Sequence, residues 1–155
     1  MKNIPGVIIR PLKKFTDERG WLSECFRQDE LSKDLYPTMA YVSMTKPGVA
    51  RGPHEHIEQT DYFCFCGPST FKLYLWDNRP GSPSCGEKAE YTVGEDNPVI
   101  AIIPPKVVHA YKNVGKKDCF VINLPNRLFA GRNKRDKVDE IRYENQLDSK
   151  FRIED

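Results

Sequence analysis

The chain has 155 residues, of which 39% are hydrophobic and 30% charged, and its formal net charge is +2. These values predict one globular domain with a sizeable hydrophobic core rather than a disordered chain. The longest apolar run, 99–103, is far shorter than the roughly 20 residues that cross a bilayer, so a membrane protein is not expected. No basic run is interleaved with aromatic residues, and nucleic acid is therefore not an expected partner.

Short apolar segments, separated by turns rich in glycine, proline and small polar residues, follow one another along the chain. Segments with strand character cover 7–10, 21–27, 41–45, 62–66, 71–76, 90–93, 99–103 and 120–124. A short helix is expected over 29–35, ending before Pro37, and weak helical character returns after 131. Strands at roughly ten-residue spacing predict one all-β domain, 1–155, built as a sandwich or barrel.

Alternating hydrophobicity indicates which side chains form the core. In 71–76 the period of two places Phe71, Leu73 and Leu75 on one face of a strand. The same reasoning predicts burial of a set drawn from three strands: Phe63, Phe65, Leu73, Leu75, Ile100 and Ile102.

Cysteine usage indicates the redox environment. Five cysteines are present, an odd number, and none forms a C-x-x-C pair. Cys64 and Cys66 share one face of an expected strand, where small buried thiols are common. The apolar stretch near the amino terminus is too short for a signal peptide. We therefore expect a reduced protein of the cytoplasm.

The densest group of chemically useful side chains lies at 51–61, between two apolar segments. It holds two of the three histidines, His54 and His56, whose spacing puts both rings on one face of a strand. Asp61 begins the next strand, and the third histidine, His109, follows a Pro-rich turn. A polar loop with solvated histidines is the simplest alternative to a functional site.

Two kinds of chemistry fit these residues. Three histidines and one carboxylate, His54, His56, Asp61 and His109, could bind a divalent transition metal. Their spacing resembles the two sequence motifs of cupins, with Asp61 in place of the usual Glu and Lys106 in place of Gly. Alternatively, a histidine in a cavity acts as a general base beside a phosphate site. Arg19 and Arg51, each followed by Gly, could then contact a diphosphate through two hydrogen bonds.

Six blocks, in order over nearly the whole chain, closely resemble the dTDP-4-dehydrorhamnose 3,5-epimerase family. They are DERG at 17–20, ECF at 24–26, GVARGPH at 48–54, DNRPGSPSCG at 77–86, IPPKVVH at 103–109 and EIRY at 140–143. The resemblance implies a cupin-type double-stranded β-helix, or jelly roll, with short helical segments at the C-terminal end. It also implies a homodimer in carbohydrate biosynthesis that acts, without a metal cofactor, on a nucleotide-linked 4-keto-6-deoxy sugar.

The resemblance also implies roles for individual residues. His54 matches the family's catalytic base and His109 its cavity histidine. Arg19 and Arg51 match the groups that grip the nucleotide diphosphate. The remaining expected substrate-binding residues are Glu24, His56 and Gln59.

Five positions depart from the family pattern. The family's Lys after the base is replaced by Asp61, an anion where a cation would stabilise an enolate. The family's general-acid Tyr has no counterpart at 125–129. The Asp that orients the base is expected at Glu144 or Asn145. The Gln and Asn expected before the Arg51 block are Met39 and Tyr41.

Because a positioned acid or base contributes about 10²–10⁴ in rate, replacements for the missing Lys and Tyr are expected. Candidates are His56, His109 and Tyr111, and the expected catalytic set is His54, His109, Tyr111 and Asp61. The sequence thus favours an epimerase or ketoisomerase of a nucleotide-linked keto sugar. A metal-dependent cupin enzyme and a non-catalytic sugar-nucleotide-binding cupin are the alternatives.

Overall fold

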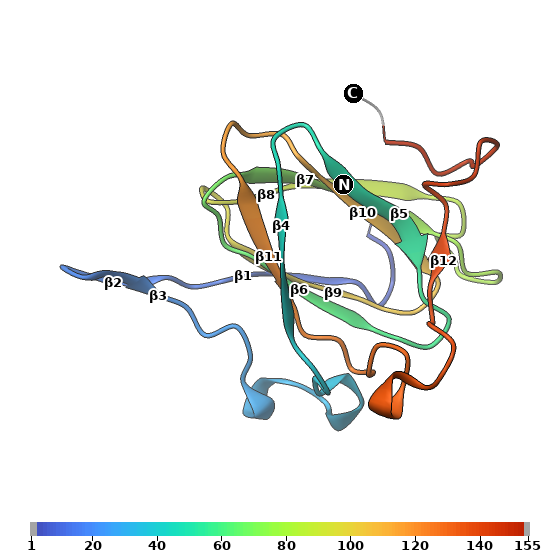
Figure 1. The fold of residues 1–155 in the computed structure, drawn as a ribbon, viewed down its shortest axis with the longest axis horizontal. Coiled ribbons are helices and arrows are strands. Elements are labelled where there is room, and N and C mark those ends of the chain that lie inside the picture. Colours follow the sequence, from blue (N-terminus) through green and yellow to red (C-terminus); the bar gives the residue numbers. More distant parts are fainter. Residues whose placement is uncertain (1–2, 154–155) are drawn as a thin grey trace.

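Two five-stranded antiparallel sheets face each other in the computed structural model, which describes residues 3–153 (Figure 1). The first sheet has the order β1 (Ile8–Pro11), β9 (Val99–Ile103), β6 (Asp61–Phe65), β11 (Cys119–Asn123) and β4 (Tyr41–Thr45). The second has the order β12 (Ile141–Arg142), β5 (Ala50–Glu55), β10 (Val107–Asn113), β7 (Thr70–Asp77) and β8 (Lys88–Gly94). The expected all-β double-sheet fold is confirmed.

The core lies between the sheets, where side chains of β6 and β9 meet those of β7 and β10. All six side chains predicted to be buried are at most 2% exposed: Phe63, Phe65, Leu73, Leu75, Ile100 and Ile102. β9 is buried along its whole length because its two faces contact different apolar clusters. Ala101 and Ile103 face the other sheet, whereas Ile100 and Ile102 pack on the outer side with Leu12. Full burial of such a side chain contributes about 1.5–3 kcal/mol.

Between residues 3 and 153, helical structure is limited to three short 3₁₀ turns. The helix expected over 29–35 is two separate turns, Gln28–Glu30 and Lys33–Leu35, and the third is Arg132–Lys134. The expectation of helical segments at the C-terminal end was therefore only partly right, because the chain beyond Arg132–Lys134 forms β12 on the edge of the second sheet. No helix within 3–153 is long and apolar enough to cross a membrane.

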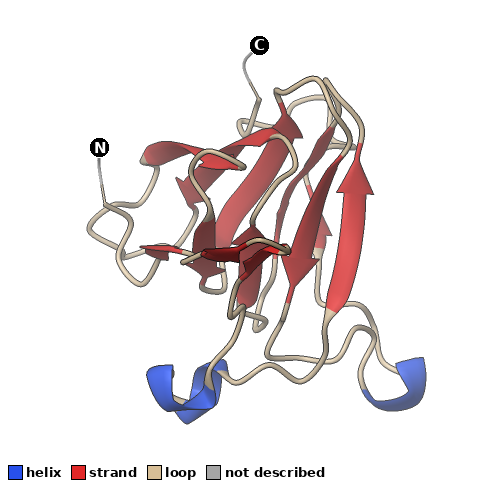
Figure 2. Ribbon diagram, turned by 90° about the vertical axis from the view of Figure 1, so that its left-hand side faces the viewer, coloured by secondary structure: helices blue, strands red, loops and turns tan. Residues whose placement is uncertain are grey.

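A two-stranded hairpin, β2 (Phe15–Asp17) and β3 (Gly20–Leu22), projects away from the two sheets (Figure 1). Figure 2 shows the paired sheets with the short helical turns gathered beyond one end of the strands. Phe15, Trp21 and Leu22 on the hairpin are 46%, 52% and 62% exposed. These are large apolar side chains to leave in water, and they make the hairpin a candidate contact surface.

Candidate active site

A cavity of about 1260 Å³ opens beside β4 and β5. Its volume exceeds the roughly 300–1,000 Å³ of most small-molecule sites, and an elongated ligand such as a nucleotide sugar would fit. The lining comes from β4 and the residues before it, β5, the turn after β5, single residues of β6 and β10, and the segment 125–144. It includes Met39, Tyr41, Ser43, Arg51, His54, His56, Gln59, Tyr111, Lys134, Lys137 and Glu140.

The pairing of β5 with β10 brings two of the histidines together. His54 lies directly opposite His109 in the register, and their ring centroids are 4.3 Å apart. His56, just after β5, has its ring centroid 5.5 Å from that of His54. The sequence predicted that the rings of His54 and His56 share one face of a strand. The Gly and Pro residues before His54 and His109 indicated loops, whereas both of these histidines lie within strands.

Gly52 allows the two strands to approach closely at this point. Its φ is +79°, and a Cβ atom there would lie 2.5 Å from the carbonyl oxygen of His109 and 3.1 Å from Nδ1 of His54. Glycine is therefore required by both the backbone conformation and the space.

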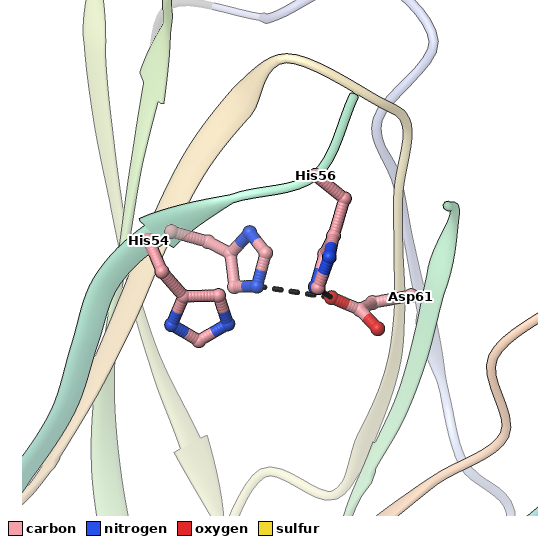
Figure 3. Close-up of side chains that lie close together, drawn as sticks. His54, His56 and Asp61 are labelled. Atoms are coloured by element: carbon pink, nitrogen blue, oxygen red, sulfur yellow. Dashed lines mark ion pairs between the residues drawn. The ribbon is translucent and has the colours of Figure 1, made fainter. Parts of the chain in front are cut away.

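Asp61, the first residue of β6, reaches the histidines from the opposite sheet. Its Oδ2 atom lies 3.1 Å from Nε2 of His56 and 3.0 Å from Nε2 of His109. The other oxygen, Oδ1, accepts hydrogen bonds from Gln59 at 2.9 Å and from Asn123 at 2.8 Å. Figure 3 shows the side chains of His56 and Asp61 directed toward one another, with His54 beside them.

Burial and charge shift the pKa values of this group in opposite directions. Burial favours the neutral form of Asp61, but His109 and His56 outweigh it and hold the pKa of Asp61 well below its usual range. Burial also favours neutral His56, but Asp61 and the carbonyl of Asp139 raise its pKa to about 9. Burial, followed by the neighbouring His109, lowers the pKa of His54 to about 2. His54 is thus a neutral imidazole at the surface of the cavity.

Glu140 is the carboxylate nearest to His54. Its Oε1 atom lies 3.7 Å from Nε2 of His54, and both side chains are 14% exposed. The sequence placed Glu144 or Asn145 in this position, and the structure corrects that placement. Pairing of β12 with β5 sets Arg142 opposite His54. Glu140, which comes just before β12, therefore lies beside His54, whereas Glu144 and Asn145 come after the strand.

Asp139 holds the turn that carries His56 and Gln59. Its two carboxylate oxygens accept hydrogen bonds from the backbone N–H groups of residues 57, 58 and 59, each at 2.9 Å. Its backbone carbonyl accepts a hydrogen bond from Nδ1 of His56. No local pattern in the sequence pointed to Asp139, because its partners lie 80 to 82 residues away.

Arg51 and Tyr111 also line the cavity. Arg51 donates to Oγ1 of Thr45 at 3.0 Å and to the carbonyl of Met44 at 2.8 Å, which fixes its guanidinium at the rim. The hydroxyl of Tyr111 lies 3.2 Å from that of Ser43. Burial raises the pKa of Tyr111, so its hydroxyl is a proton donor rather than a phenolate.

Arg19 and Glu24, two of the predicted substrate-binding residues, are not among the described residues that line the cavity. Arg19 lies at the tip of the β2–β3 hairpin, where its side chain is 82% exposed and pairs with Asp17 at 2.5 Å. Glu24 pairs with Arg27 at 3.1 Å. Within one chain these residues are separated from the histidines.

Several cations at the cavity rim were missed by sequence reasoning. Lys134 and Lys137 belong to a basic run that resembled a solvated surface, yet they line the cavity together with Arg127. Only the folded chain shows this, because the segment after β11 leads to β12, which pairs with the edge of β5 (Figure 1).

Comparisons with known proteins agree with this architecture. Residues 1–137 match the family described as dTDP-4-dehydrorhamnose 3,5-epimerase. A protein of Haloferax volcanii, named a probable low-salt glycan biosynthesis epimerase, is 38% identical over 130 residues, which is 83% of each chain. The spore coat polysaccharide biosynthesis protein SpsL of Bacillus subtilis is 34% identical over 119 residues, covering 77% of this chain and 78% of that protein.

A solved structure shows the same fold at low sequence identity. The dTDP sugar isomerase of Desulfovibrio desulfuricans superimposes with a TM-score of 0.80 at 22% identity, covering 93% of this chain and 87% of the other. The facing antiparallel sheets are thus those of a cupin-type jelly roll, a fold used by nucleotide-sugar epimerases. The chain belongs to the dTDP-4-dehydrorhamnose 3,5-epimerase family, and the predicted resemblance is confirmed.

Proposed function

We propose that this epimerase removes a proton from the carbon next to the keto group of a nucleotide-linked 4-keto-6-deoxy sugar, with His54 as the base. The observation that carries the proposal is the placement of His54, whose ring lines the cavity with Glu140 3.7 Å from its Nε2 atom. The C–H proton passes to His54, and the electron pair of that bond forms an enolate on the keto oxygen. Glu140 stabilises the resulting imidazolium.

The nucleotide diphosphate would bind at the basic rim of the cavity. Arg51 is fixed there by two hydrogen bonds, and Lys134 and Lys137 lie along the same lining. Guanidinium and ammonium groups are the usual partners of phosphate oxygens. Met39 and Tyr41, where the family pattern has Gln and Asn, also line the cavity, and a reduced preference for thymine is expected from them.

Return of the proton requires an acid on the other face of the sugar. Tyr111 is our candidate, because its hydroxyl is protonated, lines the cavity and contacts Ser43. His109 and Asp61 are almost fully buried beneath the cavity and shape its floor. Gln59 connects Asp61 with the cavity lining through its hydrogen bond to Oδ1.

We further infer that the active form is a homodimer. The β2–β3 hairpin exposes Phe15, Trp21 and Leu22 on a projection that its own chain does not cover. Docking of this hairpin on a second copy would bury those side chains and move Arg19 and Glu24 towards the partner's cavity. This arrangement reconciles the expected role of Arg19 with its remote position in the single chain.

The test of the proposed function is hydrogen exchange. The protein is incubated in deuterated water with dTDP-4-keto-6-deoxyglucose and with its UDP counterpart, and the sugar is followed by NMR spectroscopy. Deuterium should appear next to the carbonyl, with inversion slower than exchange or confined to one carbon. If neither sugar gained deuterium, proton abstraction would be rejected.

A further inference from the structure

Three donor atoms converge at the floor of the cavity: Nε2 of His56, Nε2 of His109 and Oδ2 of Asp61. The two nitrogens lie 3.1 Å and 3.0 Å from the oxygen. With one ring nitrogen of His54, all four donors lie within 4.8 Å of one another. Ligands bound to one transition-metal ion at about 2.0–2.2 Å, with bond angles near 90°, are about 3 Å apart. Both histidine nitrogens already have this spacing from Oδ2 of Asp61.

Hydrogen bonds on the far side of each ring fix the inward direction of these atoms. Nδ1 of His56 donates to the carbonyl of Asp139, and Nδ1 of His109 donates to the carbonyl of Val107 at 3.1 Å. Histidines that bind metals almost always donate their second ring nitrogen in this way. The carboxylate is fixed in the same manner, because Gln59 and Asn123 bind its Oδ1 atom and leave Oδ2 directed at the histidines.

Two of the inward atoms face each other as an ion pair but make no hydrogen bond of normal geometry. Oδ2 of Asp61 and Nε2 of His109 are among the few buried polar side-chain atoms of residues 3–153 that lack one, although they are 3.0 Å apart. Both residues are 1% exposed. Buried polar atoms are normally paired, and such an exception requires an explanation. A cation between them would satisfy both atoms.

We propose that His56, Asp61 and His109 bind one divalent first-row transition-metal ion at the floor of the cavity. Two imidazoles and a carboxylate favour such ions over calcium or magnesium, which prefer all-oxygen sites. The ion takes the place of histidine protons that otherwise face the Asp61 carboxylate, since ligands bind metals in their deprotonated forms. His54, which lies nearer the cavity beside Glu140, stays outside the set of ligands.

The ion would perform the task of the cation that this chain lacks. An ion held there would lie next to the cavity at His56, the one of the three ligands that lines it. This role rests on the proposed function. The keto oxygen of the sugar would bind at the ion, which would stabilise the enolate charge while His54 takes the proton. Asp61 thereby changes from an anion that repels the enolate into a ligand of the cation that attracts it.

Metal binding can be measured without any sugar. The full-length protein is stripped with a chelator, dialysed and titrated with Co²⁺ alone, with visible absorption and calorimetry as readouts; Zn²⁺ is then added as a competitor. We expect one Co²⁺ per chain, d–d bands that Zn²⁺ abolishes, and a higher melting temperature with metal. No saturable binding to the wild-type protein would overturn the proposal.

Variants then locate the ion. D61N and H109Q should weaken Co²⁺ binding by about 100-fold or more, and Gln59→Leu, which removes the side-chain contacts to Asp61 and His56, by about 10- to 100-fold. D118N removes an exposed carboxylate elsewhere and should bind like the wild type. Circular dichroism confirms that each variant is folded. Undiminished binding in folded D61N or Gln59→Leu would overturn the assignment.

The exchange assay separates this inference from the proposed function. Metal-loaded and stripped proteins are compared with the same keto sugar, and faster exchange in the loaded form supports both proposals. Bound Co²⁺ with no exchange would uphold the site and reject the function. Equal exchange in both forms would uphold the function and overturn the role of the ion.

Discussion

His54 and His109 lie opposite each other on β5 and β10, with ring centroids 4.3 Å apart, yet they occupy different environments. His54 lines the cavity, whereas His109 is 1% exposed and contacts Asp61 beneath it. A single strand pairing thus separates a histidine that can reach a substrate from one that organises the floor. The two positions should respond differently to mutation.

His54→Asn should lower the rate of solvent exchange by about 10²–10⁴, the usual contribution of a general base. Asparagine keeps a polar side chain of similar length in the cavity but cannot accept the proton. Deuterium incorporation measured by NMR spectroscopy gives the rate, and D118N serves as the control. A His54→Asn protein that exchanges at the wild-type rate would show that another group is the base.

Arg51→Ala should weaken the binding of dTDP by about 1.5–3 kcal/mol, the range for hydrogen bonds to charged groups. The side chain is pre-positioned by Thr45 and Met44, so its loss removes a fixed cation from the rim. Isothermal titration calorimetry with dTDP and UDP measures the change. Arg152→Ala, an exposed arginine elsewhere, is the matched control. Equal affinities for the Arg51→Ala and control proteins would contradict the assignment.

Replacement of both Trp21 and Leu22 by Ser should convert the proposed homodimer into monomers. Both side chains are exposed and apolar, and a partner chain would bury them. Serine removes this apolar surface and with it the free energy gained by burial. Analytical ultracentrifugation at micromolar concentration measures the change. The same variant should lose dTDP affinity as Arg19→Ala does, if Arg19 acts on the partner's cavity. A wild-type protein that sediments as a monomer would disprove this prediction.

Gly52→Ala should destabilise the protein more than Gly86→Ala does. Both glycines have positive φ values, +79° and +86°, so alanine is strained at each. Only at position 52 does the new Cβ meet a backbone oxygen at 2.5 Å, whereas nothing lies within 4 Å at position 86. Urea unfolding should therefore show an additional loss of about 1 kcal/mol or more for Gly52→Ala. Equal losses would mean that β5 and β10 can move apart without cost.

Asp77→Asn should cost stability at neutral pH but not in acid. The buried carboxylate accepts hydrogen bonds from Arg79, Ser82 and Ser84, and these hold the pKa of Asp77 below its ordinary value despite its burial. A lowered pKa in the folded state means stability that is present above the unfolded pKa, about 3.9, and lost as the pH falls through the folded value. The unfolding free energies of wild type and Asp77→Asn should thus converge below about pH 4. A constant difference across the pH range would refute this account.

Much of the fold could be predicted from the sequence because its signal is local. Alternation over two residues marks Leu73 and Leu75 as core, and the continuous apolar run of β9 marks a strand buried on both faces. The strands that carry the histidines were harder to predict, since Gly52 and Pro53 interrupt the pattern where β5 approaches β10. There the close approach of two backbones, rather than apolar periodicity, determines the structure.

The site was predicted in part for the same reason. His54, His56 and Asp61 are near neighbours in sequence, and their convergence with His109 follows from the matching motifs. Glu140 and the lysines of the rim come from a segment with no periodic pattern, and only tertiary contacts bring it to the cavity. The position of Arg19 is the hardest to predict, because its proposed contact with the cavity depends on a second copy of the chain.

The three hydrogen bonds that Asp139 accepts from residues 57–59 affect how this active site can evolve. Backbone N–H groups are the same in every residue except proline, so the carboxylate fixes the path of the turn without constraining its side chains. Ile57 and Glu58 can therefore vary while His56 keeps its place. Asp139 cannot be replaced in the same way, because its own side chain makes the three hydrogen bonds. It lies two residues beyond the segment that matches the family. Substitutions at residues 57 and 58 that keep the backbone N–H groups should therefore leave the turn in place, whereas loss of the carboxylate at position 139 should release it.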